Sequence, residues 1–225
     1  FKNDQAMTIV VSIILVYTSL NICGNLVLYF FRFDVGNEGA YSIFAAVAFA
    51  AQVLVMMVIP LLRKRFSKSQ LFISGFIIQI AGFAVILIMA FAKLYTPQSW
   101  YILCLPGILI YLGYGMLNVI MTIFLSDSVD YGEVMNGTRE ESVIFSMQTF
   151  TVKLASGVAV FLAGLVVDWI HLDTAAAVQT QDTLDALRMW MTIPSVILLI
   201  VGIFVFKRFY KLDDTRMEEI KSKLN

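Results

Sequence analysis

Residues 142–170 read SVIFSMQTFTVKLASGVAVFLAGLVVDWI, and this run indicates the class of protein. It is apolar and long enough to cross a bilayer, whose hydrocarbon core takes about 20 residues of helix. Lys153 lies near its middle, and an ionisable side chain at that depth marks a functional site by default. Acidic residues are absent at a comparable depth from every other apolar stretch of the sequence. We therefore expect the partner of Lys153 to come from outside these residues.

The composition agrees with a membrane protein. The 225 residues are 60% hydrophobic and 14% charged, with a mean hydropathy of +0.84. These values are too apolar for a soluble domain and predict an all-α protein that crosses the membrane repeatedly. The formal net charge is zero and the basic residues form no phosphate-tracking patch, which argues against a nucleic-acid partner. Cys23 and Cys104 both fall inside apolar segments, so we expect packing rather than a disulfide.

Six apolar runs of membrane-spanning length follow one another along the chain. Their approximate bounds are 8–31, 40–62, 70–92, 100–125, 142–170 and 188–206, and polar or turn-forming residues separate them. The first run opens the chain almost at once, so we expect a membrane helix there rather than a cleaved leader. Residues 1–208 then form a six-helix transmembrane bundle, and an even number of crossings leaves both ends on one side.

Basic residues assign the two sides of the membrane. Twelve fall on the side of the termini, whereas the opposite side carries three, Arg32, Lys93 and Arg188. Loops rich in Lys and Arg stay in the cytoplasm, so both ends are expected to be cytoplasmic, in a cell inner or plasma membrane. The twelve are Lys2, Arg63, Lys64, Arg65, Lys68, Arg139, Lys207, Arg208, Lys211, Arg216, Lys221 and Lys223.

Residues 209–225 form a cytoplasmic tail in this interpretation. Met217, Ile220 and Leu224 fall at helical spacing, which predicts a short amphipathic helix that packs or lies at the interface. His171 is the only histidine and lies in an external loop without a nearby cysteine. We therefore expect no metal site and no cofactor.

A polar stripe runs along the fifth span. Spacings of four, three, four and three place its members on one side of a helix; they are Ser142, Ser146, Thr149, Lys153 and Ser156. Serine and threonine also join helices in membranes, but a central lysine favours a face turned toward something wet. Thr138 and Glu141 fit a capping box, so this helix is expected to begin near Arg139.

Lys153 then lies roughly 21 Å along the helix at 1.5 Å per residue, too deep to reach an interface. Three states remain open for it: a neutral amine, a position in a water-filled cavity, or a pair with a carboxylate of another helix. The last two together are favoured. Ala155, Ala159 and Ala163 repeat beside the stripe at four-residue spacing, which permits close approach of a neighbouring helix.

Other polar residues in the spans are weaker candidates. Each is more often an interhelical hydrogen bond than a ligand contact; they are Asn21, Asn25, Gln52, Gln79 and Asn118. Asn21 and Asn25, four residues apart, share a helix face. The spans contain no Ser/His/Asp set, paired catalytic carboxylates or metal-ligand cluster, so we do not expect an enzyme.

Asp127 and Asp130 end the fourth span, where the negative end of the helix dipole disfavours carboxylates. Arg139 lies just across the turn Asn136-Gly137, and its guanidinium can pair with one or both aspartates. A solvated acidic helix end without a fixed partner is the alternative.

The segment from residue 127 to 153 resembles the signature between helices ten and eleven of the glycoside-pentoside-hexuronide:cation symporters, the melibiose permease family. The resemblance is carried by DSVDYGE at 127–133, GTREES at 137–142, Phe145-Ser146 and Lys153. It extends more loosely over the whole chain, whose six spans look like helices seven to twelve of a major-facilitator transporter. Met135 and Asn136 stand where many members carry lysine and threonine, which suggests a smaller charge network in this loop.

The resemblance implies one half of a secondary transporter that couples sugar or glycoside symport to Na⁺, Li⁺ or H⁺ by alternating access. The N-terminal six-helix half would carry the carboxylates that bind the cation, and the sugar would lie between the halves. Two alternatives are a porter of a non-sugar, such as a lysolipid or drug, and a membrane sensor that binds sugar without moving it.

The resemblance also implies roles for particular residues. Lys153 matches the family lysine that lies close to the cation-binding carboxylates. The candidates for substrate contact, from the family motif or from the polar pattern, are Thr149, Gln148, Asn118, Asn21 and Asn25. The residues that match the cytoplasmic gate network are Asp127, Asp130, Arg139 and Glu133.

Overall fold

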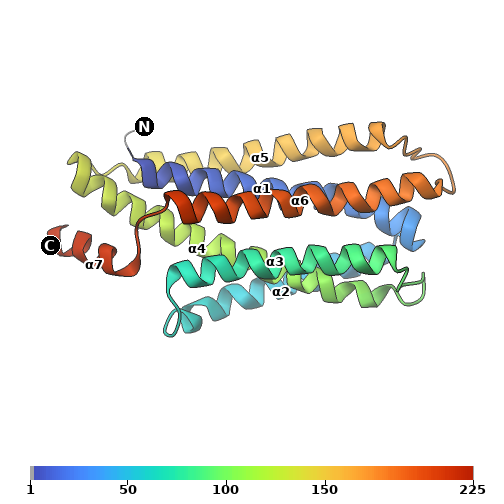
Figure 1. Cartoon of the computed structure of the whole chain (residues 1–225), viewed down its shortest axis with the longest axis horizontal. Coiled ribbons are helices and arrows are strands. Elements are labelled where there is room, and N and C mark those ends of the chain that lie inside the picture. The colour runs from blue at the N-terminus through green and yellow to red at the C-terminus, as the bar shows by residue number, and fades with distance from the viewer. Residues whose placement is uncertain (1–2, 225) are drawn as a thin grey trace.

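The computed structural model describes residues 3–224, apart from the side chains at 221, 223 and 224. Figure 1 shows long helices running side by side and a short helix at one end. Six of the helices are long and apolar enough to cross a membrane, which confirms the predicted all-α membrane fold. The elements are α1 (Asp4–Tyr29) with the π-helical η1 (Phe30–Val35), α2 (Ala40–Leu62), α3 (Lys68–Phe91), η2 (Trp100–Leu103), α4 (Cys104–Asn136), α5 (Glu141–Trp169), α6 (Gln181–Phe209) and α7 (Asp214–Leu224).

The fourth and sixth helices are longer than the sequence pattern predicted. α4 does not end at residue 125 but continues to Asn136, because the polar residues after 125 include no proline. The helix ends at Gly137, whose φ of 72° is the left-handed conformation that glycine adopts most easily. α6 begins at Gln181 rather than 188, with the Thr180 side chain accepting a hydrogen bond from the Thr183 amide.

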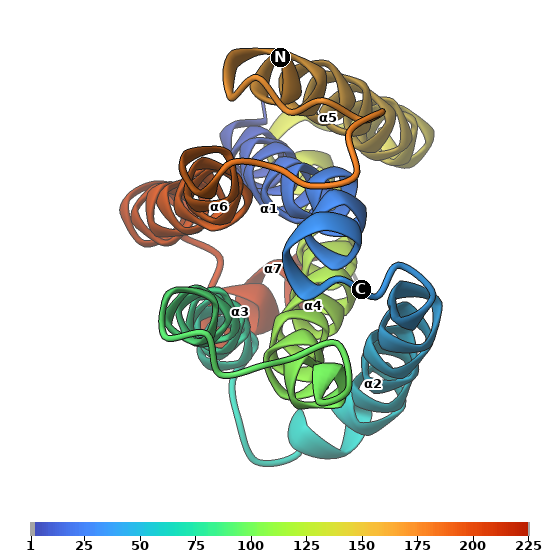
Figure 2. The ribbon, with the colours of Figure 1, turned by 90° about the vertical axis from the view of Figure 1, so that its right-hand side faces the viewer.

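The helices form two groups of three. α1 packs against α5 and α6, whereas α4 packs against α2 and α3, and contacts of α3 with α6 and of α1 with α4 join the groups. The end-on view of Figure 2 shows the two groups one above the other. Both termini lie at the same end of the bundle in Figure 1, as an even number of crossings requires.

Small residues set the closest helix contacts. A Cβ atom on Gly113 of α4 would lie 2.5 Å from the carbonyl oxygen of Gly75 on α3, so only glycine permits this approach. On α5, Ala155, Ala159 and Ala163 are all buried, and α5 packs mainly on α1. The predicted close contact along the alanine stripe is therefore confirmed.

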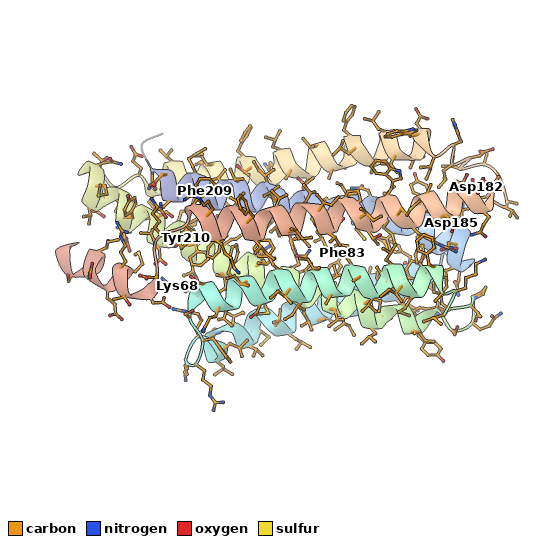
Figure 3. All side chains as sticks on the ribbon, in the orientation of Figure 1. Lys68, Phe83, Asp182, Asp185, Phe209 and Tyr210 are labelled. Carbon is orange, nitrogen blue, oxygen red and sulfur yellow. The ribbon has the colours of Figure 1, made fainter. Side chains whose placement is uncertain are left out.

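A buried ion pair ties the end of the bundle opposite to the termini. The Arg188 guanidinium of α6 donates to both carboxylate oxygens of Asp34 in η1, and it also donates to Asp185 at 2.7 Å. The Tyr95 hydroxyl, from the loop after α3, donates to Asp34 at 2.6 Å. The side chains of Arg188 and Asp34 are each only 3% exposed. Figure 3 shows Asp185 at this end. Beyond the charge of each residue, no pattern in the sequence indicated the pairing.

The end that carries the termini also carries Arg63, Lys64, Arg65 and Arg139, and we call it the basic end. Here Tyr210 stacks on Phe206 and packs against Phe124. The predicted amphipathic tail helix is confirmed as α7: Met217 and Ile220 are buried against α4 residues. The side chain of Leu224, the third residue of that prediction, lies outside the described residues.

Replacing Arg188 with leucine leaves the Asp34 carboxylate buried without its cation. We expect the complete protein in detergent to lose about 3–5 kcal/mol of unfolding free energy, seen as a lower thermal midpoint. The matched control is Arg32→Leu at the same end. Arg32 pairs with Glu38 at 3.6 Å, but this ion pair lies at the surface, since the Arg32 side chain is 42% exposed and the Glu38 side chain 56%. That loss should stay below about 1 kcal/mol, and equal losses in the two variants would contradict the assignment.

Candidate functional site

Thr149 and Lys153 lie on an exposed side of α5, next to the alanine stripe that packs on α1. Both residues are exposed, whereas the neighbouring alanine stripe is buried. The Thr149 hydroxyl donates to the Phe145 carbonyl of its own helix at 3.1 Å. Ser142 and Ser146 are exposed as well, so the predicted polar stripe is an open surface of this chain.

Lys153 forms no ion pair with any carboxylate in the described part of the chain. The nine ion pairs within residues 3–224 involve Arg32, Arg63, Lys68, Arg139 and Arg188 as the cations. Lys153 is thus an ionisable group in the middle of an apolar helix, Glu141–Trp169, and no carboxylate of residues 3–224 forms an ion pair with it. A partner for it outside these residues stays a prediction.

A row of hydrogen-bonded polar side chains crosses from α1 through α4 to α5, and we call it the polar row. The Asn118 amide of α4 donates to the Tyr17 hydroxyl of α1 at 2.7 Å. The Thr122 hydroxyl, one turn further along α4, bonds to the Asn118 carbonyl and receives the Gln148 amide of α5 at 3.5 Å. The members of the polar row are Tyr17, Asn118, Thr122 and Gln148.

The sequence predicted part of this arrangement. Gln148, which lies about 100° around the helix from Thr149, reaches α4 rather than the open side of α5. Asn21 and Asn25 lie half-buried on α1, and each amide donates at 2.7 Å to the backbone carbonyl four residues earlier. Tyr17 and Thr122 were not predicted, since a lone tyrosine or threonine in an apolar helix has no distinctive pattern.

Arg139 forms the second charged cluster, at the basic end. Its guanidinium donates to Asp130 at 3.0 Å, to Glu133 at 2.8 Å and to Glu141 at 3.2 Å. The pairing with Asp130 is therefore confirmed. Hydrogen bonds to Glu133, then to Asp130 and Glu141, raise the pKa of Arg139 above its ordinary value.

The predicted capping box is wrong. α5 begins at Glu141, and its N-cap residue is Glu140 rather than Thr138. The Glu141 carboxylate accepts a hydrogen bond from Arg139 instead. The local charge pairing overrides the pattern that the four residues 138–141 suggested.

Asp127 pairs with Lys68 and not with Arg139, which corrects that part of the predicted network. Because α4 remains helical through residue 136, Asp127 lies about 60° around the helix from Asp130 and faces α3. The Lys68 ammonium is hydrogen-bonded to Asp127, and both side chains are 6% exposed. The carboxylate also lies at the start of α3, where the helix dipole favours it.

Lys68 extends the cluster to the tail. Its ammonium lies 3.3 Å from the Asp214 carboxylate at the start of α7, and its backbone amide donates to the same carboxylate. Burial alone would raise the pKa of Asp214, but the charges of Lys68 and Arg63 hold it below its ordinary value. Figure 3 labels Lys68 at this end, near Tyr210. The Ser67–Gln70 capping box, which starts α3 just before this lysine, was the available sequence signal.

Within residues 3–224, no group of three or more His, Cys, Asp or Glu side chains is placed to hold a metal ion. Cys23 and Cys104 are both free thiols, as predicted.

Six membrane helices in two packed groups of three, with a polar row at mid-depth and ion pairs at each end, are the build of one half of a major-facilitator fold.

Comparison with known proteins identifies the family. Residues 1–214 match the family described as MFS/sugar transport protein, and the chain belongs to it. Similar proteins include an uncharacterized symporter, YjmB, of Bacillus subtilis (strain 168), which is 26% identical over 99% of this chain and 47% of its own length. The raffinose carrier protein of Pediococcus pentosaceus is 22% identical over 99% of this chain and 34% of its own length.

The isoprimeverose transporter of Lactiplantibacillus pentosus is 25% identical over 94% of this chain and 43% of its own length. The chain thus spans less than half the length of these three curated relatives. These matches support the resemblance to the glycoside-pentoside-hexuronide:cation symporters.

Replacing Lys68 with alanine strands the Asp127 carboxylate in a buried position. We expect a loss of about 3–5 kcal/mol in the unfolding free energy of the complete protein, measured by chemical or thermal unfolding in detergent. The double variant Lys68→Ala/Asp127→Ala should recover part of this loss, because it removes both charges. Lys64→Ala, an exposed lysine in the loop just before α3, is the control. Additive losses in the double variant would show that the two side chains are not coupled.

Proposed function

We propose that this chain is the C-terminal half of a secondary transporter that carries a sugar or glycoside together with Na⁺, Li⁺ or H⁺ by alternating access. The observation that carries the proposal is Lys153, a lysine at mid-span on an exposed helix face with no counter-ion in the described part of the chain. A charge in that position needs water or a carboxylate, and an N-terminal half facing α5 would supply both.

The names of the relatives support a sugar as substrate. Sugar carriers or transporters for raffinose and isoprimeverose match nearly the whole of this chain. Carbohydrates need several hydrogen-bond donors and acceptors at fixed positions. Thr149 presents its hydroxyl on the exposed face of α5, and the amides of Gln148 and Asn118 belong to the polar row. These three residues would bind sugar hydroxyls, with Asn21 and Asn25 lining the same side of α1.

In this proposal Lys153 holds one arm of the cation site. Its ammonium would approach the cation-binding carboxylates of the other half and would balance their charge when the cation leaves. Sugar and cation affinities then become coupled, because both depend on how Lys153 and those carboxylates are arranged.

The two charge clusters of the basic end would form the cytoplasmic gate. Arg139 with Asp130 and Glu133 is exposed and can exchange partners with the other half, whereas Lys68 with Asp127 is buried and fixes the ends of α3 and α4. The excess of basic residues at this end supports a cytoplasmic location for it, in a protein of the cell membrane. A porter of a non-sugar and a sugar sensor that does not transport remain the two rival outcomes of the uptake experiment.

The experiment is uptake of labelled glycosides by the complete protein, with and without imposed Na⁺ and H⁺ gradients. We expect gradient-driven accumulation in the wild type, and its loss in Lys153→Ala because the cation site loses its counter-charge. Lys93→Ala is the matched control, since Lys93 is an exposed lysine outside the spans. Accumulation of no glycoside under either gradient would reject sugar symport, and unchanged coupling in Lys153→Ala would remove this lysine from the mechanism.

Replacing Arg139 with alanine should shift the complete protein toward the state open to the cytoplasm, because the gate loses its cation. A cysteine placed in the cavity should then react faster with a thiol reagent added from the cytoplasmic side. Arg65→Ala, an exposed arginine at the same end, should leave that rate unchanged. Equal rates in Arg139→Ala and wild type would count against the gate.

A further inference from the structure

Tyr17 is the one aromatic member of the polar row. Its hydroxyl accepts the hydrogen bond from Asn118, and its ring packs against Tyr114 with centroids 5.5 Å apart and an interplanar angle of 75°. Two residues of α4 thus fix the orientation of a side chain that belongs to α1. Tyr114 is buried at 8% exposure, whereas Tyr17 is only half-buried, so part of the Tyr17 side chain remains open.

The depth of Tyr17 matches that of Lys153. α1 and α5 both start at the basic end, and a rise of 1.5 Å per residue puts Tyr17 about 20 Å from the start of α1 and Lys153 about 18 Å from the start of α5. Asn21 and Asn25 follow Tyr17 at four-residue spacing along α1, on adjacent turns of one helix side. A held aromatic ring therefore lies level with the lysine and beside several amide groups.

Aromatic rings and amides together are the chemistry that recognises a sugar ring. The face of an aromatic ring is electronegative, and the axial C–H bonds of a pyranose present a slightly positive apolar surface to it. The amides can donate to and accept from the hydroxyls around the rim of the sugar. A tyrosine hydroxyl that accepts from Asn118 also keeps its own hydrogen for another acceptor.

A purely structural role fits Tyr17 less well. Tyr114 already fills the space between α1 and α4, and the Ser19–Ser195 hydrogen bonds of 2.8 and 3.0 Å hold α1 to α6 at this depth. If the Asn118 amide and the Tyr17 hydroxyl served only to join α4 to α1, the Tyr17 ring would not need to remain partly exposed.

We propose that Tyr17 is a specificity-determining residue that stacks against the ring of a cyclic sugar, with Asn118 as the residue that positions it. The inference rests on the proposed sugar transport and names the residue that selects pyranosides over open-chain polyols. Loss of the ring therefore weakens the binding of cyclic sugars and leaves the fold intact.

The test uses the complete protein and calorimetric titration with methyl pyranosides of glucose, galactose and xylose, and with mannitol as the open-chain probe. The variants are Tyr17→Leu, which keeps apolar bulk without a π face, Tyr17→Phe, which keeps the ring, and Asn118→Ala. Tyr101→Ala is the control, since Tyr101 is 61% exposed and lies in η2, at the end of the bundle opposite to the basic end.

For the pyranoside that the wild type binds best, we expect the dissociation constant to rise at least about tenfold in Tyr17→Leu and less than about threefold in Tyr17→Phe. Asn118→Ala should lie between the two, and Tyr101→Ala should match the wild type. Thermal midpoints report on folding, and if Tyr17→Leu does not fold, the same comparison is made with Tyr17→Phe and Tyr17→Trp, which should both bind.

Three results would overturn the inference while leaving the proposed sugar transport in place. Wild-type affinity in Tyr17→Leu would mean that the ring makes no contact with the sugar. A loss in Tyr17→Phe as large as that in Tyr17→Leu would assign the effect to the hydroxyl. Binding of mannitol as tight as that of the pyranosides would remove the selectivity for rings. A wild type that binds no sugar at all would reject the proposed function itself and this inference with it, a failure recognisable because it occurs without any substitution.

Discussion

The cost of holding a charge away from water organises this protein. A buried ion pair forms only with good geometry and close partners, and both ends of the bundle meet this condition, with Lys68 against Asp127 at one end and Arg188 against Asp34 at the other. Each pair joins helices from different parts of the sequence: α3 with α4, and α6 with the extension of α1. Lys153 differs because it lies between these ends without a counter-ion among the described side chains, and that contrast carries the functional argument.

The contacts that hold the helices together are buried, whereas the side chains that can change partners are exposed. Glycine and alanine contacts bring the helices of each three-helix group close together, and one buried ion pair holds an end of each group, so each group is packed as one body. The groups available for exchange lie at the surface: Arg139 with its three acidic partners, and Thr149 and Lys153 on the open side of α5. The proposed rocking against a second half would use packed helices of this kind with changeable surface contacts.

Hydropathy and charge predicted most of the fold. Membrane helices must be long and apolar, and Lys and Arg concentrate in the loops on the cytoplasmic side. α2 was predicted to the residue, and the alanine stripe of α5 packs as expected. One error came where polar residues remain helical: Asp127 lies within α4 rather than at its end, and it pairs with Lys68 rather than with Arg139. Tyr17, Thr122 and the Arg188 cluster could not be predicted, since their partners are distant in sequence and single residues carry no periodic pattern.

The central claim is that the open side of α5 lines an aqueous path for sugar. The direct measurement is the reaction of a membrane-impermeant maleimide with Thr149→Cys and Val158→Cys, each in a complete protein that lacks Cys23, Cys104 and any other cysteine. Val158 is 42% exposed on the same helix but lies on a different side. The account predicts that Thr149→Cys reacts, that a transported glycoside slows the reaction, and that Val158→Cys does not react. An unreactive Thr149→Cys, or equal reaction at both positions, would contradict it.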